Sequence, residues 1–237
     1  DREAVSAMLT STGEIDIIIP RGGKSLVKKI QDEARVPVFA HLEGICHVYV
    51  DKDADWKKTL EVIINAKTDK ISGCNALDKV LVDKNIEDYE SKLKDLDKTL
   101  SSLGVEIIVD KNVNAILSER DLISKDEVWF EEFLAMKIAI GEADGIEDAI
   151  SKINTYSGGH SSAILTEDKA VATHFMENID TAAVYHNAST RFTDGGQMGV
   201  GAELAISTDK LHHRGPLGLK QLVTNKYYVF GDGQVRV

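Results

Sequence analysis

Short apolar runs alternate with amphipathic stretches along almost the whole of this 237-residue chain. The apolar runs have the length of buried strands, and the stretches between them repeat their apolar residues at helical spacing. A strand, a helix and a further strand in succession form a parallel crossover, so this alternation predicts an α/β fold. The expected strands are 15–19, 36–40, 45–50, 79–82, 105–109, 136–140, 163–165 and 182–185, and the expected helices are 1–11, 26–34, 56–66, 86–103, 118–123, 145–154 and 167–178.

A glycine turn, Pro20-Arg21-Gly22-Gly23-Lys24-Ser25, joins the first expected strand to the helix that follows it. This order of elements suits a phosphate, since free N–H groups and the dipole at a helix N-terminus point towards the anion. The spacing falls short of the G-x-G-x-x-G pattern, so an ordinary turn is the alternative. Residues 1–50 hold fewer strands than a complete nucleotide-binding domain, which has two βαβαβ halves. The sequence therefore predicts that the chain begins within such a domain.

The overall composition excludes several classes of function. A net charge of −11 leaves no basic excess to displace counterions from nucleic acid. No apolar run approaches the ~20 residues of a membrane span, and the charged start, Asp1-Arg2-Glu3, is not typical of a signal peptide. Two cysteines, Cys46 and Cys74, are too few for a disulfide framework and favour a reducing compartment. We expect a cytoplasmic protein that binds neither nucleic acid nor membrane.

Cys74 is the candidate nucleophile, because it lies between an expected helix and an expected strand, where the chain changes direction. Its small neighbours, Ser72 and Gly73, leave room for a substrate to approach the sulfur. If residues 75–77 open a helical turn, their free N–H groups stabilise a thiolate and an adjacent oxyanion. The alternative is a buried cysteine that acts only as a small hydrophobic residue.

A loop rich in glycine and polar side chains follows the expected strand at 182–185. It begins Asn187-Ala188-Ser189-Thr190-Arg191-Phe192-Thr193-Asp194-Gly195-Gly196-Gln197 and continues to Glu203. Its amide, hydroxyl and guanidinium groups can together hold a carboxylate or a phosphate by charge-assisted hydrogen bonds. The alternative is a long loop of turn residues without a ligand.

The same loop resembles, nearly letter for letter, a signature of the γ-glutamyl phosphate reductase family, also called glutamate-5-semialdehyde dehydrogenase. Further matches are Ile19-Pro20-Arg21-Gly22, Gly44-Ile45-Cys46-His47, Ile64-Asn65-Ala66-Lys67-Thr68, Cys74-Asn75, Gly201-Ala202-Glu203 and Leu211-His212-His213-Arg214-Gly215-Pro216. The resemblance covers essentially the whole chain. This family is a branch of the aldehyde dehydrogenase superfamily.

The resemblance implies an aldehyde-dehydrogenase-like α/β fold in three parts. Residues 1–42 would form the C-terminal part of a Rossmann-like nucleotide-binding domain, 43–216 an α/β catalytic domain bearing the thiol, and 217–237 a C-terminal oligomerisation strand. In this last part, residues 225–237 have a strand-turn-strand pattern that turns at Gly231-Asp232-Gly233. Members of the family are longer, so we expect a fragment or part of a bifunctional pyrroline-5-carboxylate synthase. The implied partners are a second copy of the chain and glutamate 5-kinase.

The resemblance also implies an activity that depends on NADPH. Cys74 matches the nucleophile, which would attack γ-glutamyl phosphate to give a thioester, and reduction by NADPH would release glutamate 5-semialdehyde in proline biosynthesis. The positions that match cofactor contacts are Arg21, Gly22, Gly23, Ser25, Glu43, Gly44 and Glu132, and those assigned to the charged groups of the substrate are Asn75, Asn187, Ser189, Thr190 and Arg191. A solvated acid is the alternative at Glu132.

The remaining histidines and Cys46 have simpler explanations than catalysis. His41 lies near the position of the base in hydrolytic aldehyde dehydrogenases, but activated water would destroy the thioester, so we expect a nicotinamide-lining turn without a base. His186 is expected in the core or a loop, and Cys46 in a buried strand. The neighbours His212 and His213 would point to opposite faces of a strand, and no acid cluster accompanies them, so we predict no metal.

Two rival functions remain open. The chain could be a folded scaffold for oligomerisation that does not bind NADPH, which an NADPH titration would reveal. It could also be a cysteine-dependent acyltransferase or hydrolase without a cofactor, although no Cys/His/Asp set is evident by spacing. Product analysis without NADPH would reveal that activity.

Overall fold

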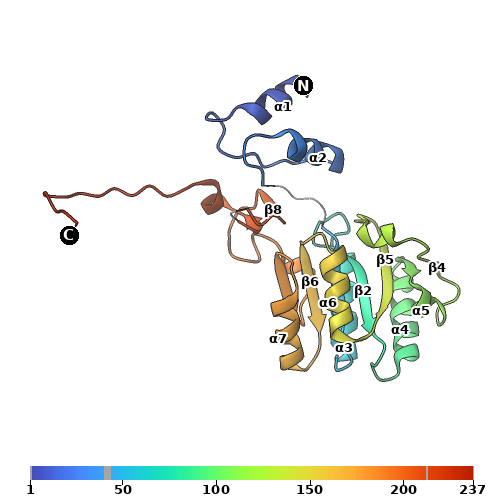
Figure 1. Ribbon diagram of the computed structural model, residues 1–237. Helices are drawn as coiled ribbons and strands as arrows, with labels where there is room; N and C mark the ends of the chain where they lie inside the picture. Colours follow the sequence, from blue (N-terminus) through green and yellow to red (C-terminus); the bar gives the residue numbers. More distant parts are fainter. Residues whose placement is uncertain (1, 40–43, 212, 237) are drawn as a thin grey trace.

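A seven-stranded parallel sheet runs through the middle of the chain (Figure 1). The computed structural model describes residues 2–39, 44–211 and 213–236. Every pairing in the sheet is parallel, in the order β4-β3-β5-β2-β1-β6-β7. The strands are β1 Cys46–Val50, β2 Leu77–Asp83, β3 Glu106–Val109, β4 Asp121–Leu122, β5 Lys137–Ala143, β6 Ser161–Leu165 and β7 Ala183–His186. The predicted α/β fold is confirmed, and each strand expected between residues 45 and 185 has a counterpart here.

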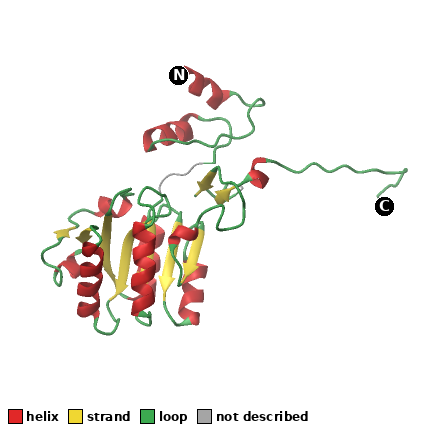
Figure 2. Cartoon of the chain, turned by 180° about the vertical axis from the view of Figure 1, so that it is seen from behind, coloured by secondary structure: helices red, strands yellow, loops and turns green. Residues whose placement is uncertain are grey.

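Helices cover both faces of this sheet (Figure 2). On β1 the side chains alternate: Val48 packs with Ile63 on one face, and Tyr49 stacks on Phe175 on the other, with ring centroids 6.1 Å apart. Because both faces are buried, the central strands carry continuous apolar runs. The helices are α3 Trp56–Thr68 and α4 Tyr89–Ser102 on the Val48 face and α6 Gly145–Tyr156 and α7 Lys169–Asn178 on the Tyr49 face, with the shorter α5 Lys111–Asn114 and 3-10 turns η1 Asp126–Phe130 and η2 Thr190–Phe192.

A smaller unit lies at the end of the sheet where the strands begin (Figure 1). It combines the N-terminal residues 2–39 with an antiparallel pair from the far end of the chain. A small core of Phe39, Ala205 and Leu217, packed against Ile17 and Ile19, joins the two segments. The elements of this N-terminal unit are α1 Arg2–Thr10, α2 Lys24–Glu33, β8 Ala205–Ser207, β9 Gly215–Leu217 and the 3-10 turn η3 Leu219–Leu222.

The strands expected at 15–19 and 36–40 are reduced to one isolated parallel bridge between Ile18 and Val38; residue 40 lies outside the described residues. Ile18 donates its N–H to Pro37 O at 2.9 Å and accepts from Phe39 N at 2.9 Å. Pro37 has no N–H with which to extend the ladder. The prediction of two strands in these positions is therefore correct in where the segments pair but wrong in how long the strands are.

The helix expected at 118–123 is wrong, because these residues form a turn followed by β4 on the edge of the sheet. Arg120 donates to Asp97 and to Ser101 Oγ on α4, and its carbonyl accepts from Asn114 Nδ2 at 3.1 Å. These contacts hold the segment alongside β3. Tertiary contacts therefore override a short and weak helical pattern.

The strand-turn-strand expected at 225–237 is also absent from the described residues 223–236. Its apolar side chains are exposed, with Tyr227 at 86%, Val229 at 90% and Phe230 at 95%. An isolated two-stranded hairpin is marginally stable in water, and no sheet edge within the described chain pairs with this tail.

Candidate active site

The Cys74 turn connects α3 to β2, and a buried ion pair links the end of α3 to the start of β2. Lys67, at the end of α3, donates to Leu77 O at 2.8 Å and lies 3.4 Å from Asp78 Oδ1. Both charged side chains are almost wholly buried, and this burial lowers the pKa of Lys67 and raises that of Asp78. Lys67 is therefore a structural residue of the turn, not one that faces an anionic substrate.

Residues 75–77 do not open a helix, so that expectation is wrong. Successive turns carry the chain across Cys74, with Gly73 N donating to Lys70 O at 3.1 Å and Ala76 N to Gly73 O at 2.9 Å. β2 then begins at Leu77. The thiol consequently receives no support from a helix N-terminus on its C-terminal side.

Gly44 packs directly against the backbone of Cys74. A Cβ built on Gly44 would lie 2.2 Å from Cys74 O and 2.9 Å from Cys74 Cβ, which no side chain tolerates. Cys46, two residues on, is fully buried in β1 and donates its thiol to Cys74 O at 3.4 Å. The buried strand position expected for Cys46 is confirmed. The assigned Glu43 and the neighbouring His41 lie outside the described residues.

The Cys74 thiol is half-buried, and its surroundings favour the protonated form. Burial first, and then the negative charges of Glu132 and Glu203, raise the pKa of Cys74 to about 11, while the positive charge of Arg21 acts in the opposite direction. Both acids therefore lie close enough to influence the sulfur. Glu132 was predicted to belong to the site, but Glu203 was not; Glu203 also accepts a hydrogen bond from Gly195 N at 2.7 Å.

On one side of the Cys74 turn, a pocket of about 280 Å³ opens towards the N-terminal unit. Arg21 and Gly22 line it together with Ser72 and Cys74, and Ala205, Ile206, Ser207, Leu217, Pro20, Val27 and Phe39 complete its wall. The fold thus brings Arg21 and Cys74 to one cavity. Gly23 caps α2 with no side-chain hydrogen bond, and the exposed Ser25 lies in the first turn of that helix. We call this cavity the Arg21 pocket.

The glycine-rich loop packs onto the other side of the turn through Asn75. This buried side chain donates from Nδ2 to Thr193 O at 2.9 Å and to Arg191 O at 3.2 Å, and Thr190 Oγ1 returns a hydrogen bond to Asn75 O at 2.8 Å. Asn75 and Thr190 therefore fix the loop beside Cys74. Thr193 continues the connection inward, with its hydroxyl 2.6 Å from Ser161 Oγ.

Among the assigned loop residues, Arg191 is the one whose charged group lines a cavity. Its Nε donates to Asp69 Oδ2 at 3.0 Å, and both residues border a second pocket of about 270 Å³. Asn187 is left-handed at φ 52° and exchanges two side-chain hydrogen bonds with the backbone of Thr166. Ser189 caps η2 by accepting from Arg191 N at 3.3 Å. We call the cavity beside Arg191 the Arg191 pocket.

Comparison with known proteins gives the family of this fold. The profile of the aldehyde dehydrogenase family matches residues 119–203. The crystal structure of γ-glutamyl phosphate reductase from Thermotoga maritima matches 100% of this chain at 43% sequence identity, with a TM-score of 0.95. The chain therefore has an aldehyde-dehydrogenase-like fold. It spans 56% of the length of the Thermotoga maritima protein.

Two further solved structures show how far the similarity extends. γ-Glutamyl phosphate reductase from Saccharomyces cerevisiae is 34% identical over 82% of this chain, which covers 48% of that protein, with a TM-score of 0.50. An engineered glycolyl-CoA reductase with bound NADP+ shares the fold at 16% identity, over 91% of this chain and 56% of its own, with a TM-score of 0.64. The expected resemblance to γ-glutamyl phosphate reductases is confirmed.

The segment that carries Glu132 is held by two adjacent residues of β2. Lys79 donates to Glu131 O at 2.9 Å and lies 3.3 Å from the centre of the Phe133 ring, while Asp78 Oδ2 accepts from Phe133 N at 3.4 Å. Glu132 thus lies between two anchored neighbours and keeps its charge near the thiol. No sequence pattern indicated this support.

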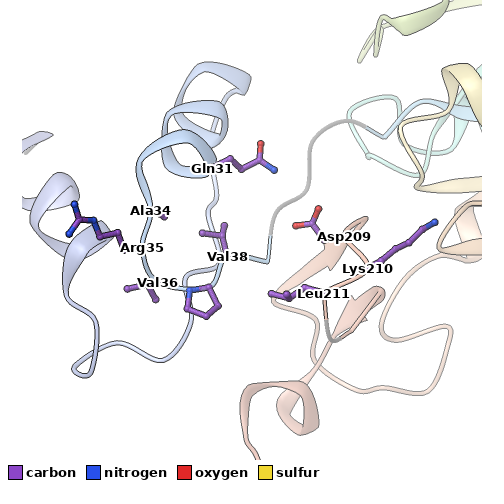
Figure 3. Close-up of a pocket in the computed structure, with 9 residues that line it drawn as sticks. Gln31, Ala34, Arg35, Val36, Val38, Asp209, Lys210 and Leu211 are labelled. Carbon is purple, nitrogen blue, oxygen red and sulfur yellow. The ribbon is translucent and has the colours of Figure 1, made fainter.

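A larger hollow of about 530 Å³ lies elsewhere, between α2 and the β8–β9 turn (Figure 3). In Figure 3, Gln31 and Val38 face Asp209 and Leu211 across it. It shares no lining residue with the Arg21 pocket or the Arg191 pocket. Its size alone therefore gives no reason to connect it with the thiol.

The described part of the chain contains neither a group of metal ligands nor a membrane-spanning helix. Within residues 2–39, 44–211 and 213–236, no three His, Cys, Asp or Glu side chains are grouped as metal ligands would be. No helix in these ranges is both long enough and apolar enough to span a bilayer. Of the two adjacent histidines, His213 lies 2.9 Å from Pro216 O through Nε2, and His212 falls outside the described residues.

Proposed function

We propose that this chain is the thiol-bearing part of a γ-glutamyl phosphate reductase, which reduces γ-glutamyl phosphate to glutamate 5-semialdehyde with NADPH in proline biosynthesis. The observation that carries the proposal is the position of Cys74, on a turn with the Arg21 pocket on one side and the Arg191 pocket on the other. The 43% identity with the Thermotoga maritima reductase supports the same activity.

The proposed reaction has a covalent step at Cys74. The thiolate attacks the acyl carbon of the acyl phosphate, a C–S bond forms, the C–O bond to phosphorus breaks, and phosphate leaves with the electron pair. A bound nicotinamide cofactor would supply the hydride that reduces the thioester carbon. The C–S bond then breaks, which releases the aldehyde and restores the thiolate. Acyl phosphate, NADPH and one proton thereby give aldehyde, NADP+ and phosphate.

The charges around Cys74 determine when the thiol becomes a nucleophile. With a pKa of about 11, most of the sulfur is protonated at neutral pH. Because Glu132 and Glu203 favour the thiol and Arg21 favours the thiolate, any change that screens the two acids activates the sulfur. A protein that keeps its thiol protonated between turnovers limits side reactions with oxidants and electrophiles.

The residues around the Arg21 pocket suit a nicotinamide dinucleotide. The guanidinium of Arg21 and the free N–H groups of the first turn of α2, at Gly23 and Ser25, would hold phosphate oxygens. Gly22 lines this pocket without a side chain and leaves room for a flat ring beside Arg21, whereas Gly44 packs against Cys74 and is proposed as a cofactor contact from the resemblance alone. Glu132 would accept hydrogen bonds from a ribose. A proposed reductase needs no hydrolytic base, so we assign none to His41.

The C-terminal tail is proposed to pair with a second copy of the chain. Residues 223–236 leave a run of β-forming side chains in solvent, among them Tyr228 at 73% and Val229 at 90% exposed. Strand addition to a sheet edge would bury them and satisfy the backbone. Light scattering on the Val229→Pro chain tests this: a lower molecular mass than that of the unaltered chain is expected, and an unchanged mass would contradict it.

The activity is tested in the direction of oxidation. Glutamate 5-semialdehyde, NADP+ and phosphate are mixed with the chain, and NADPH formation is followed by absorbance beside the Cys74→Ser variant. Phosphate-dependent NADPH formation that the variant lacks is expected. If NADPH titrates onto the chain without turnover, the reductase proposal fails, and if NADPH does not bind at all, the scaffold alternative is favoured.

A further inference from the structure

The Arg191 pocket has an unusual mixture of charges for a cavity of about 270 Å³. The end of α3 and the loop after β7 form it. It is lined by one guanidinium, two carboxylates, two amides and one aromatic ring, from Arg191, Asp69, Asp194, Asn65, Gln197 and Phe192. A ligand that matches this lining must carry both a negative and a positive group.

Arg191 supplies the site for the negative group. Only 17% of its side chain is exposed, yet Nε to Asp69 is the single hydrogen bond that its guanidinium makes with the described residues. The Nη donors remain available in a half-buried setting. A guanidinium in this state pairs well with a planar carboxylate, which can accept two parallel hydrogen bonds.

Asp69 and Asp194 supply the site for the positive group. Asp69 uses Oδ2 for Arg191, and its Oδ1 accepts no hydrogen bond within the described residues. Asp194 is oriented by two N–H groups, from Gly196 and Gln197, that donate to its Oδ1, and its Oδ2 accepts no hydrogen bond within the described residues. Asp69 is also the C-terminal cap of α3, where the helix dipole favours a cation.

The distance from Arg191 to the nucleophile suits a short acyl chain. A Cβ built on Gly73 would lie 2.9 Å from Arg191 Nη1 and 2.8 Å from Asn75 Oδ1, a buried oxygen with no partner within the described residues. Gly73 directly precedes Cys74, and consecutive Cα atoms are about 3.8 Å apart. A few methylene groups are therefore enough to connect a thioester on Cys74 with a carboxylate at Arg191.

We propose that the Arg191 pocket recognises the α-amino-acid end of the substrate, with the α-carboxylate at Arg191 and the α-ammonium at Asp69. This inference rests on the proposed function and deepens it. It makes Asp69 the residue that selects an α-amino acyl group over a plain dicarboxylic acyl group of the same length. Asp69 directly follows the motif Ile64-Asn65-Ala66-Lys67-Thr68, one of those that carried the resemblance, and is not part of it.

The test compares two small probes that differ only in the ammonium group. L-Glutamate and glutarate are titrated calorimetrically into the unaltered chain, into Asp69→Asn, and into Asp97→Asn as a control. Asp97 lies on α4, pairs with Arg120 and borders neither the Arg21 pocket nor the Arg191 pocket. The Asp97–Arg120 pair is therefore a matched control for the pair of Asp69 and Arg191. Asparagine keeps an oxygen for Arg191 and removes only the charge, which limits any damage to the fold.

The unaltered chain and Asp97→Asn should bind L-glutamate roughly tenfold more tightly than glutarate, as expected for one charge-assisted hydrogen bond. Asp69→Asn should lose most of that preference while its glutarate affinity stays within a few-fold. An unaltered chain that binds neither probe, or shows no preference, overturns the inference, as does an undiminished preference in Asp69→Asn. Turnover with NADP+ is measured separately, so failure of the proposed activity is distinguished from failure of this recognition.

Discussion

The two sides of the Cys74 turn are built in different ways. The wall of the Arg21 pocket combines segments from opposite ends of the chain, residues 20–39 and 205–217, and mixes apolar side chains with Arg21 and two serines. The Arg191 pocket is formed within the sheet body, by α3 and the loop after β7, and is mostly polar. In the proposed function, the Arg21 side receives the flat ring of the cofactor and the Arg191 side recognises the charges of the substrate. Substitutions that affect one side, the other, or both can separate these roles.

Gly44→Ala should have the largest effect, because it disturbs Cys74, the proposed nucleophile, which lies between the two sides. The added Cβ would lie 2.2 Å from Cys74 O, so the turn must move. Displacements of about 1 Å at a reacting group cost roughly a hundredfold in rate. Kinetics should show a loss of turnover, together with weaker binding of both NADP+ and the semialdehyde. Retained turnover would mean that the turn tolerates the movement and that the close packing is not needed.

Arg191→Ala should affect one side only. Removing the guanidinium should weaken binding of the substrate by roughly a hundredfold, the cost of a lost charge-assisted pair, with NADPH affinity nearly unchanged. Arg120→Ala, which also removes an arginine from an aspartate pair, is the control. Equal losses for substrate and NADPH would show that Arg191 supports the whole turn and does not recognise substrate.

Gly73→Ala should give a smaller effect on that same side. The new methyl would approach Arg191 Nη1 at 2.9 Å and Asn75 Oδ1 at 2.8 Å, and an arginine head can shift by a few tenths of an ångström. We expect a several-fold loss of L-glutamate affinity, of about 1 kcal/mol. The rate of Cys74 alkylation by iodoacetamide should stay close to that of the unaltered chain. An equal fall in the alkylation rate would mean that the two sides are not independent.

Single charges around the sulfur should give the smallest changes, visible in the pH dependence of alkylation. Only the thiolate reacts, so with a pKa of about 11 the rate should still rise steeply between pH 8 and pH 10, where an ordinary thiol levels off. Glu203→Gln removes a negative charge, lowers the pKa and should speed alkylation at pH 8 a few-fold. Arg21→Gln removes a positive charge and should slow it. Shifts in the opposite directions would contradict the assigned electrostatics.

Six of the seven strands of the sheet could be predicted from the sequence, because buried parallel strands carry apolar runs that are visible without knowledge of their neighbours. Val80 to Val82 and Ile138 to Ile140 are examples, and both lie in the core. The prediction of a helix at 118–123 was wrong, because the contacts of Arg120 with α4 determine the local structure. The bridge at Ile18 was shorter than expected because Pro37 cannot donate.

The candidate site was predictable where a motif names its residues and hidden where packing brings them together. Cys74 and Arg191 were found by their motifs. Asp69 and Glu203 were not assigned to the site, because an acid at the end of a helix or in a glycine-rich loop has no distinctive pattern. The buried pair of Lys67 and Asp78, which holds the turn, depends on a contact that spacing alone does not predict.

The central claim is that the sulfur of Cys74 carries the glutamyl group during the reaction. The most direct measurement is the intact mass of the chain after rapid acid quenching of a mixture with glutamate 5-semialdehyde and NADP+, with phosphate left out. A thioester on Cys74 should appear as a mass increase of one glutamyl group, which hydroxylamine removes and which Cys74→Ser lacks. NADPH formation without that adduct, or an equal adduct on Cys74→Ser, would contradict it.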